Sequence, residues 1–248
     1  MTSISAILQA RMNSTRLPGK SLSLLAGIPL IEHIINRLKA VTDLDHIVLA
    51  IPDSDSEYLL IEKAKQLGIT VIKGPEEDVL KRFLLAAEQV KAQHIVRVCG
   101  DDPLIDRQLM KSLIDIHLKQ NADYTITSDS IPLGTGTEVA RVETLKQIAQ
   151  TTAEPKYREH VTTWFHDNPT TGVQPRVSAP TYLLDKPYRL TVDTIDDLAF
   201  MEKVFTNFYT PSSPLIDLEQ VIHFLDTHPE IPQLNASVQQ KNWRKKSK

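Results

Sequence analysis

Three permanent cations stand close together near the start of the chain, at Arg11, Arg16 and Lys20. The loop that carries them, residues 10–20 (the cation loop), follows a short apolar run and otherwise holds small and polar residues, among them Asn13, Ser14, Thr15 and Gly19. Side-chain cations and backbone N–H groups in such a loop can surround a polyphosphate. The spacing fits neither a Walker A loop nor the G-x-G-x-x-G turn of dinucleotide-binding folds. We predict a polyphosphate site here, with a solvated basic loop as the alternative.

Carboxylates follow two later apolar runs. Asp101 and Asp102 come directly after Gly100, whose missing side chain allows a close approach. Mg²⁺ prefers hard oxygen ligands, supplied by one or two carboxylates together with substrate phosphates. One carboxylate is rarely a complete metal site, and Asp193 is the candidate partner of Asp101. The pattern favours a magnesium site, although turns and helix caps explain the same residues without a metal.

Other reactive groups give weaker signals. Glu76, Glu77 and Asp78 fit the N-terminus of a helix, where acidic side chains interact favourably with the helix dipole. Cys99 has no base beside it, so we predict a buried strand residue and not a nucleophile. His160 stands on a predicted helix, and both core packing and substrate contact remain open for it. Neither zinc spacing nor a G-x-S-x-G nucleophile elbow occurs in the sequence.

The elements that would position these groups alternate along the chain. Short β-branched runs predict buried strands at residues 4–8, 47–51, 70–72, 95–98 and 124–127. Amphipathic stretches between them predict helices at residues 29–40, 54–67, 76–90 and 107–120. Such alternation is typical of an α/β fold with a Rossmann-like, mostly parallel sheet flanked by helices. Ligands of open α/β sheets gather at the carboxyl ends of the strands, where the cation loop and Asp101 would lie.

The pattern is less regular after residue 128. Prolines and glycines predict a loop over residues 132–136, and an apolar run predicts a strand that ends at Asp193. Further helices are predicted at residues 143–150, 155–166, 194–207 and 217–227. We predict one domain over residues 1–248, with a subregion around residues 130–185 for acceptor binding or dimerisation.

Composition limits the class of protein. The 248 residues carry 28 Lys and Arg against 31 Asp and Glu, a net charge of −3, so neither nucleic acid nor a membrane is an expected partner. The single cysteine, Cys99, excludes an internal disulfide and fits a reducing compartment. We find no signal leader and no membrane-length apolar stretch, and predict a cytoplasmic protein. The basic tail, residues 241–248, is most simply a solvated terminus.

Six segments stand out in order along the chain: ILQARMNSTRLPGK (residues 7–20), GPEEDVLKRF (74–83), RVCGDDPLI (97–105), PLGTGTEV (132–139), REHVT (158–162) and LTVDTIDDL (190–198). Together they resemble the cytidylyltransferases that activate acidic sugars, the superfamily of the acylneuraminate and 3-deoxy-manno-octulosonate cytidylyltransferases. Within that superfamily the chain is most similar to the branch of spore-coat polysaccharide biosynthesis. The resemblance covers most of the chain, and its specificity comes from the ordered set and not from a single motif.

The resemblance implies roles for individual residues. Arg11, Arg16 and Lys20 would hold the CTP triphosphate and act in catalysis with Asp101. Mg²⁺ would be bound by Asp101 and Asp193. The nucleotide would be contacted by Gln9, Ala10, Arg11, Asn13, Ser14, Lys20, Asp78, Arg82, Arg97 and Gly100. The acceptor would lie against Glu138, Arg158 and His160.

The implied reaction is Mg²⁺-dependent transfer of CMP from CTP to an oxygen of a sugar or sugar acid, with release of pyrophosphate, in surface or spore-coat polysaccharide biosynthesis. Related enzymes are commonly dimers, so the resemblance also allows for a homodimer. A nucleotide-sugar-dependent glycosyltransferase is the alternative enzyme, although adjacent Asp101 and Asp102 replace its spaced D-x-D motif. A noncatalytic nucleotide-binding module is the other alternative, and the intact cation loop and carboxylates disfavour it.

Overall fold

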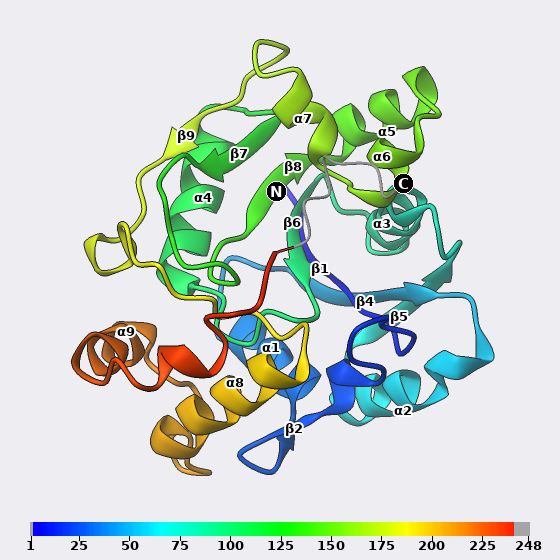
Figure 1. Ribbon diagram of the computed structural model, residues 1–248. Coiled ribbons are helices and arrows are strands. Elements are labelled where there is room, and N and C mark those ends of the chain that lie inside the picture. The colour runs from blue at the N-terminus through cyan, green and yellow to red at the C-terminus, as the bar shows by residue number, and fades with distance from the viewer. Residues whose placement is uncertain (1, 241–248) are drawn as a thin grey trace.

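A seven-stranded sheet in the order β5-β4-β1-β6-β8-β7-β9 forms the centre of the computed structural model, which describes residues 2–240 (Figure 1). β1, β4, β5 and β6 run parallel, whereas β8 is antiparallel to both β6 and β7. The strands of this sheet are β1 (Ile4–Gln9), β4 (His46–Pro52), β5 (Thr70–Gly74), β6 (His94–Cys99), β7 (Tyr124–Thr127), β8 (Glu138–Arg141) and β9 (Arg176–Val177). A separate hairpin pairs β2 (Leu24–Leu25) with β3 (Ile28–Pro29). The predicted α/β class and mostly parallel sheet are confirmed.

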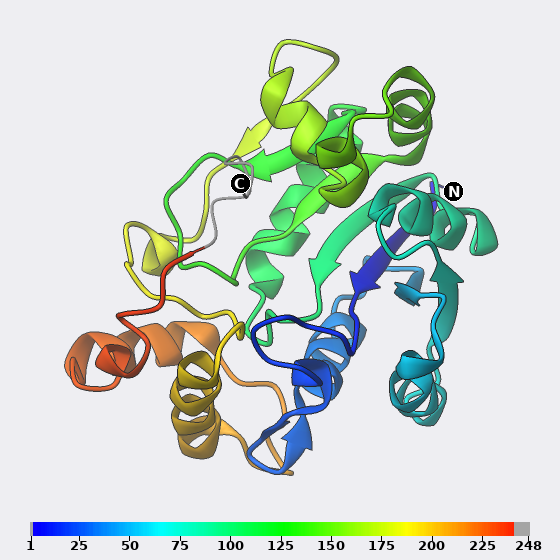
Figure 2. The same cartoon turned by 45° about the vertical axis from the view of Figure 1, so that its right-hand side comes forward.

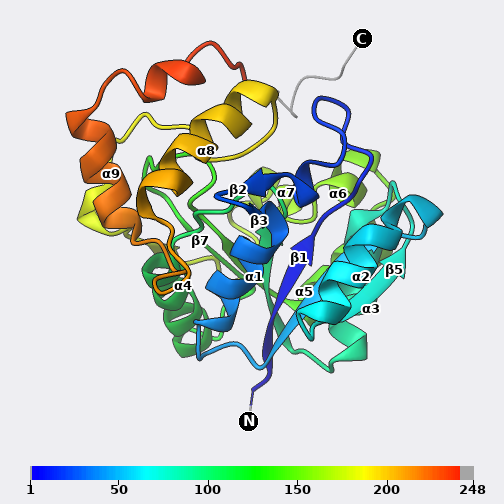
Figure 3. The same cartoon turned by 90° about the horizontal axis from the view of Figure 1, so that it is seen from below.

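Helices cover both faces of the sheet, and each face has its own apolar core. One core includes side chains of α1, α2, α4, α8 and α9, and the other includes side chains of α3, α5 and α7. Figure 3 shows α1, α2 and α8 on the same side of the sheet. No helix within residues 2–240 has the length and apolar character needed to cross a membrane. The helices are α1 (Leu30–Lys39), α2 (Tyr58–Gln66), α3 (Val79–Gln89), α4 (Arg107–Lys119), α5 (Val142–Thr151), α6 (Pro155–Glu159), α7 (Thr163–Asp167), α8 (Ile195–Phe208) and α9 (Leu218–Thr227), with short 3-10 turns at Lys20–Leu22, Asp55–Glu57, Thr181–Leu183 and Pro232–Leu234.

The order of the strands creates a switch point beside β1. The chain adds β4 and then β5 on one side of β1, and afterwards crosses to place β6 on the other side. The strand order therefore reverses beside β1, and ligands of open α/β sheets bind at the carboxyl ends of the strands next to such a point. Ala6 and Leu8 of β1 pack into the core of α1 and α8, whereas Ile7 packs into the core of α3. Because strand side chains alternate, Gln9 at the end of β1 faces the α3 side.

The five predicted strands and most predicted helices are confirmed, with ends shifted by a few residues. The single helix predicted over residues 155–166 is wrong, because the chain breaks between α6 and α7. His160 leaves the helical conformation (φ −112, ψ 88), and the Thr162 hydroxyl donates to buried Glu138 at 2.8 Å. The helix predicted from residue 76 begins only at Val79.

Two further predictions concern the second half of the chain. The strand predicted to end at Asp193 is wrong: residues 190–193 form no strand, and they follow an isolated bridge between Arg189 and Leu133. The loop predicted over residues 132–136 is confirmed, and β8, for which no strand was predicted, begins after it and pairs with β6. β8 and β9 belong to the region around residues 130–185 and are strands of the same central sheet. The basic tail lies outside the described residues.

Candidate functional site

A cleft of about 590 Å³ opens at the carboxyl ends of β1 and β6, within the range of small-ligand sites. The cation loop, the start of α3, the turn after β6, the end of α6 and the segment before α8 contribute its walls. Figure 2 shows the cation loop in dark blue beside the yellow segment that leads into α8. The residues predicted from the sequence that line this cleft are Gln9, Ala10, Arg11, Ser14, Arg16, Lys20, Arg82, Gly100, Asp101, His160 and Asp193.

The cation loop is held in shape by its own backbone and by Glu57. The Met12 N–H donates to Oε2 of Glu57 at 3.0 Å, and the Gly19 N–H donates to the Met12 carbonyl at 2.8 Å. Gly19 adopts φ 73, in the left-handed region that favours glycine. This turn directs Lys20 toward the cleft at the start of a 3-10 helix.

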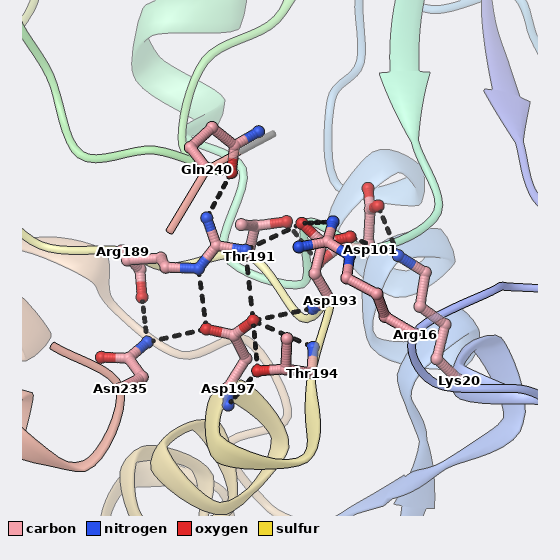
Figure 4. Close-up of polar contacts among 10 residues, drawn as sticks. All are labelled: Arg16, Lys20, Asp101, Arg189, Thr191, Asp193, Thr194, Asp197, Asn235 and Gln240. Atoms are coloured by element: carbon pink, nitrogen blue, oxygen red, sulfur yellow. Dashed lines mark hydrogen bonds and ion pairs between the residues drawn. The ribbon is translucent and has the colours of Figure 1, made fainter. Parts of the chain in front are cut away.

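Lys20 lies between two carboxylates that come from distant parts of the chain. Its Nζ is 2.7 Å from Oδ2 of Asp101 and 2.8 Å from Oδ1 of Asp193 (Figure 4). Arg16 adds a second cation, with Nη2 2.9 Å from Oδ2 of Asp193. Burial alone would raise the pKa of Asp193, but Lys20 and Arg16 outweigh it and hold the pKa below its usual value. Burial alone would likewise lower the pKa of Lys20, but Asp101 and Asp193 raise it above its usual value.

Gly100 allows this arrangement because β1 and β6 touch at their ends. The Gly100 N–H donates to the Gln9 carbonyl at 2.8 Å. A Cβ at position 100 would lie 2.7 Å from that carbonyl oxygen and 2.8 Å from the Ala10 Cβ. Only glycine fits between the two strand ends, and the chain then turns so that Asp101 faces the cation loop.

The donor set suits a divalent cation. Oδ2 of Asp101 and Oδ1 of Asp193 already share one cationic group, the ammonium of Lys20. Oxygen donors that converge on one positive charge match the preference of Mg²⁺ for carboxylate ligands. The residues therefore fit the cation predicted from the sequence, provided that Lys20 moves aside.

A second acidic cluster beside this one is less suited to a metal. Ligand atoms of Cys99, Asp101 and Asp102 lie within 4.8 Å of one another. Burial raises the pKa of the Cys99 thiol well above its usual value, so the thiolate that a metal requires is disfavoured. Burial and the adjacent Asp101 carboxylate raise the pKa of Asp102 as well. Cys99 is the last residue of β6, as predicted for a strand residue.

The start of α3 forms the opposite wall of the cleft. Arg82 donates from Nη1 to the carbonyls of Pro75 and Glu76 at 2.5 and 2.7 Å, and so fixes the turn before the helix. Burial and the nearby Arg11 lower the pKa of Arg82. Asp78 does not line the cleft, because its carboxylate caps α3 by accepting the Lys81 N–H at 2.9 Å.

Two predicted residues are buried partners of each other and lie outside the cleft lining. Nη1 of Arg97 is 2.8 Å from Oε2 of Glu138. Glu138 also accepts from the hydroxyls of Tyr124 and Thr162. Burial alone would raise the pKa of Glu138, but Arg97 and these donors hold it far below its usual value. This geometry favours a structural role for Arg97 and Glu138. It does not support the predicted contact of Arg97 with the nucleotide or that of Glu138 with the acceptor.

Three other predicted residues divide between the cleft and its surroundings. Arg158 pairs with Asp78 at 3.5 Å and donates to the Ala149 carbonyl, away from the cleft lining. Asn13 is exposed and donates to Oγ of Ser56 at 3.3 Å. His160 does line the cleft, and burial lowers its pKa.

Sequence reasoning missed two residues that hold the site together. Glu57 supports the cation loop, but its position within a predicted helix gave no sign of that contact. Arg189 donates from Nη2 to Oδ2 of Asp193 at 2.8 Å and from Nε to Oδ1 of Asp197 at 2.8 Å. The spacing of four between Arg189, Asp193 and Asp197 was the available signal, and the prediction of a strand there obscured it.

Comparisons with known proteins show which proteins the chain is similar to. The family model for cytidylyltransferases matches residues 5–241. The spore coat polysaccharide biosynthesis protein SpsF of Bacillus subtilis is 33% identical over 235 residues, covering 93% of this chain and 97% of that protein. A cytidylyltransferase structure from Leptospira borgpetersenii superposes with a TM-score of 0.88 at 24% identity, covering 97% of this chain and 100% of the other. A CMP:2-keto-3-deoxy-manno-octonic acid synthetase complexed with CTP superposes with a TM-score of 0.62 at 17% identity, covering 83% and 99%. The two structures show a shared fold.

Proposed function

The chain belongs to the cytidylyltransferase family, and from this membership and the geometry of the cleft we propose that it transfers CMP from CTP to an oxygen of a sugar or sugar acid, releasing pyrophosphate. The observation that carries the proposal is the meeting of Arg16 and Lys20 with Asp101 and Asp193 at the switch point of the sheet. Cations for a triphosphate and carboxylates for a metal are the two parts that such a reaction needs.

The chain's own groups bind and orient the reactants. The acceptor oxygen attacks the α-phosphorus in line with the departing pyrophosphate, and the new P–O bond forms as the bond from the α-phosphorus to the bridging oxygen breaks. The leaving oxygen takes the electron pair, and the proton of the acceptor hydroxyl passes to the released pyrophosphate or to water. Arg16 and Lys20 stabilise the negative charge that grows on pyrophosphate, an effect of about 2.7–4 kcal/mol for one well-placed donor. Little covalent work is left to the protein, so positioning supplies most of the rate.

Asp101 and Asp193 are the residues that would hold Mg²⁺. When bound, the ion neutralises phosphate charge and acidifies the incoming hydroxyl. Lys20 now neutralises the same two carboxylates at 2.7 and 2.8 Å. We expect Lys20 to exchange these carboxylates for the CTP phosphates when nucleotide and metal bind together.

The acceptor is proposed to enter from the α6 side. Glu159 and His160 line the cleft there, opposite the cation loop across the strand ends. The name of SpsF supports an acceptor used in a surface or spore-coat polysaccharide. Of the three predicted acceptor residues, His160 is the one that lines the cleft. Glu138 is paired with Arg97 and Arg158 with Asp78, both outside the lining of the cleft.

The test is pyrophosphate release from CTP and Mg²⁺ across a panel of sialic-acid-like, octulosonate-like and phosphorylated acceptors. The proposal expects release with at least one acceptor, and a nucleotide product that carries one phosphate and the sugar. Turnover of a nucleotide-sugar with release of a nucleoside diphosphate would identify a glycosyltransferase instead. CTP binding without pyrophosphate release with any acceptor would indicate a noncatalytic module.

A further inference from the structure

We propose that Arg189, locked in place by the buried carboxylate of Asp197, is a positioning residue that orients Asp193 so that Oδ1, and not Oδ2, serves the cation. This inference rests on the proposed function, which makes Asp193 a ligand of Mg²⁺. It assigns a task to a network that the reaction itself does not require (Figure 4).

The guanidinium of Arg189 joins two carboxylates through its Nε and Nη2 atoms. Its Nε donates to Oδ1 of Asp197 at 2.8 Å, and Nη2 donates to Oδ2 of Asp197 at 3.1 Å. The same Nη2 donates to Oδ2 of Asp193 at 2.8 Å. The side chain of Asp197 is 0% exposed and that of Arg189 is 10% exposed, so the pair is anchored inside the protein. A planar guanidinium held at two points leaves little freedom to the third contact.

Asp197 also fixes the backbone on which Asp193 stands. Its Oδ2 accepts the N–H groups of Asp193 and Thr194, both at 3.0 Å. The Thr194 hydroxyl accepts the Asp197 N–H at 3.2 Å, which completes a capping box at the start of α8. The buried carboxylate of Asp197 therefore fixes the main chain of Asp193 directly and fixes its carboxylate through Arg189.

The two oxygens of Asp193 have different partners. Oδ2 accepts from Arg16 and Arg189, whereas among the described residues Oδ1 is paired with Lys20. Arg16 and Lys20 belong to the cation loop and are expected to turn to the triphosphate. Arg189 cannot follow, because leaving Asp197 would strand a buried charge without its partner. Oδ2 therefore stays occupied, and Oδ1 is the oxygen released to the cation.

The C-terminal part of the described chain closes the network from the other side. Nδ2 of Asn235 donates to the Arg189 carbonyl and to Oδ1 of Asp197, both at 3.0 Å. Nη1 of Arg189 donates to Oε1 of Gln240. Every nitrogen of the guanidinium then has an acceptor, which holds the plane of Arg189 in one orientation.

A purely structural role for the network predicts something different. A helix cap needs only Thr194 and Asp197, whose mutual bonds are complete without Arg189. The contact of Arg189 Nη2 with Asp193 adds nothing to the cap of α8. If the network were purely structural, loss of this contact would lower the stability of the protein and leave its metal affinity unchanged. Positioning predicts instead that metal affinity changes with Arg189 even where the protein stays fully folded.

The experiment measures Mn²⁺ binding, with CTP present, to the full chain and to Arg189→Lys and Asp197→Asn. Lysine keeps the charge but cannot reach both carboxylates, and asparagine keeps the shape of Asp197 without its charge. Residues that orient metal ligands typically affect metal affinity by about 10–100-fold, and we expect the affinity for Mn²⁺ to fall by that factor in both variants. CTP affinity without metal should change by less than about threefold, because phosphates are held by other residues. All measurements are made well below the melting temperature of each variant.

Arg141→Lys is the matched control. Arg141 also spreads its guanidinium over several acceptors, at Asn121, Ala122 and Asp123. It pairs with His94 at the amino end of β6, the opposite end of the strand from the cleft. The control should lose stability and keep its Mn²⁺ affinity.

Unchanged Mn²⁺ affinity in Arg189→Lys and Asp197→Asn, with only a lower melting temperature, would overturn the inference. Failure of the proposed function looks different: the unaltered chain would bind Mn²⁺ and CTP yet release no pyrophosphate with any acceptor. Weakened Mn²⁺ binding in the two variants of such a chain would still support the positioning role. An unaltered chain that binds no Mn²⁺ even with CTP would contradict the positioning role directly.

Discussion

Nζ of Lys20 lies 2.7 Å from Oδ2 of Asp101, although the two residues are 81 positions apart in the chain. The same ammonium contacts Asp193, so the cation loop is closed onto the carboxylates. Nucleotide and metal would each compete with one side of these ion pairs. The phosphates would attract Lys20 away from the carboxylates, and the metal would take its place between Asp101 and Asp193. Each should therefore make binding of the other easier, because each removes a partner that the other must displace.

The first prediction concerns the cations. Lys20→Ala and Arg16→Ala should each slow turnover by about 100–1000-fold, because each removes a donor to the developing pyrophosphate. CTP binding should weaken, while CMP binding should change much less, since CMP lacks the β and γ phosphates. Binding constants for both nucleotides check this. Lys111→Ala, which removes an exposed lysine paired with Asp43, is the control and should behave as the unaltered chain. If either variant lost CMP and CTP binding equally, the cation loop would have a structural role and no specific contact with the β and γ phosphates.

The second prediction concerns the carboxylates. Asp101→Asn and Asp193→Asn keep the size of the side chain and remove its charge, so each variant should fold. Each should abolish Mg²⁺-dependent turnover, and the double variant should be little worse than either single one, because the two groups act as a unit. Steady-state rates over a Mg²⁺ titration measure this. Robust activity in one single variant would remove that residue from the metal site.

The third prediction separates two candidate acceptor residues. His160 lines the cleft, whereas Arg158 pairs with Asp78 and Ala149 beside it. His160→Ala should raise the acceptor KM severalfold and leave the CTP KM nearly unchanged. Arg158→Lys should lower the melting temperature and leave both KM values alone, because it loses a planar contact that only supports α6. A raised acceptor KM in Arg158→Lys would restore the role implied by the family resemblance.

The sequence was sufficient where pattern and chemistry are local. The alternation of strands and helices predicted the mostly parallel sheet, which the structure confirms. The positions of the cation loop and Asp101 directly after strands predicted that they would lie together, and both line one cleft. The cap of α8 is equally local, because the T-x-x-D spacing of Thr194 and Asp197 forms a capping box.

Tertiary contacts place three of the predicted site residues outside the lining of the cleft. Arg97, Glu138 and Arg158 belong to quoted motifs, but the sequence cannot tell a buried ion pair from a ligand contact. Glu138 becomes a buried partner because β8 is antiparallel to β6, opposite Arg97 in register. Pairing between distant segments sets that register, so no local pattern reveals it.

The fourth prediction concerns pH and lies away from the cleft. Nδ1 of His94 and Nε2 of His117 are 2.9 Å apart, and Nδ1 of His117 is 2.8 Å from the Thr125 hydroxyl. Burial, with Arg141 nearby, lowers the pKa of His94 from 6.5 to about 4 and that of His117 from 6.5 to about 3. The unfolded chain therefore binds more protons than the folded one below about pH 6.5. The free energy of unfolding should be highest above that pH and should fall as the pH drops toward 4.

Chemical unfolding between pH 7 and pH 4.5 measures this slope. His117→Gln removes one titrating ring and should flatten the dependence, whatever it does to stability at pH 7. His46→Gln, at an exposed position at the start of β4, should leave the slope as it is. A slope that is the same in His117→Gln as in the unaltered chain would assign the acid sensitivity to other groups.

In the proposed reaction the α–β bond of CTP breaks while Lys20 contacts the triphosphate and Asp101 holds Mg²⁺. The most direct test of this reaction follows ³²P from CTP labelled at either the α or the γ position, with Mg²⁺ and the acceptor that supports turnover. We predict that α label enters the sugar nucleotide, that γ label leaves as pyrophosphate, and that neither transfer occurs in Asp101→Asn. The proposed reaction would be contradicted if γ label appeared as free phosphate while α label stayed in CDP, or if Asp101→Asn transferred the α label at the unaltered rate.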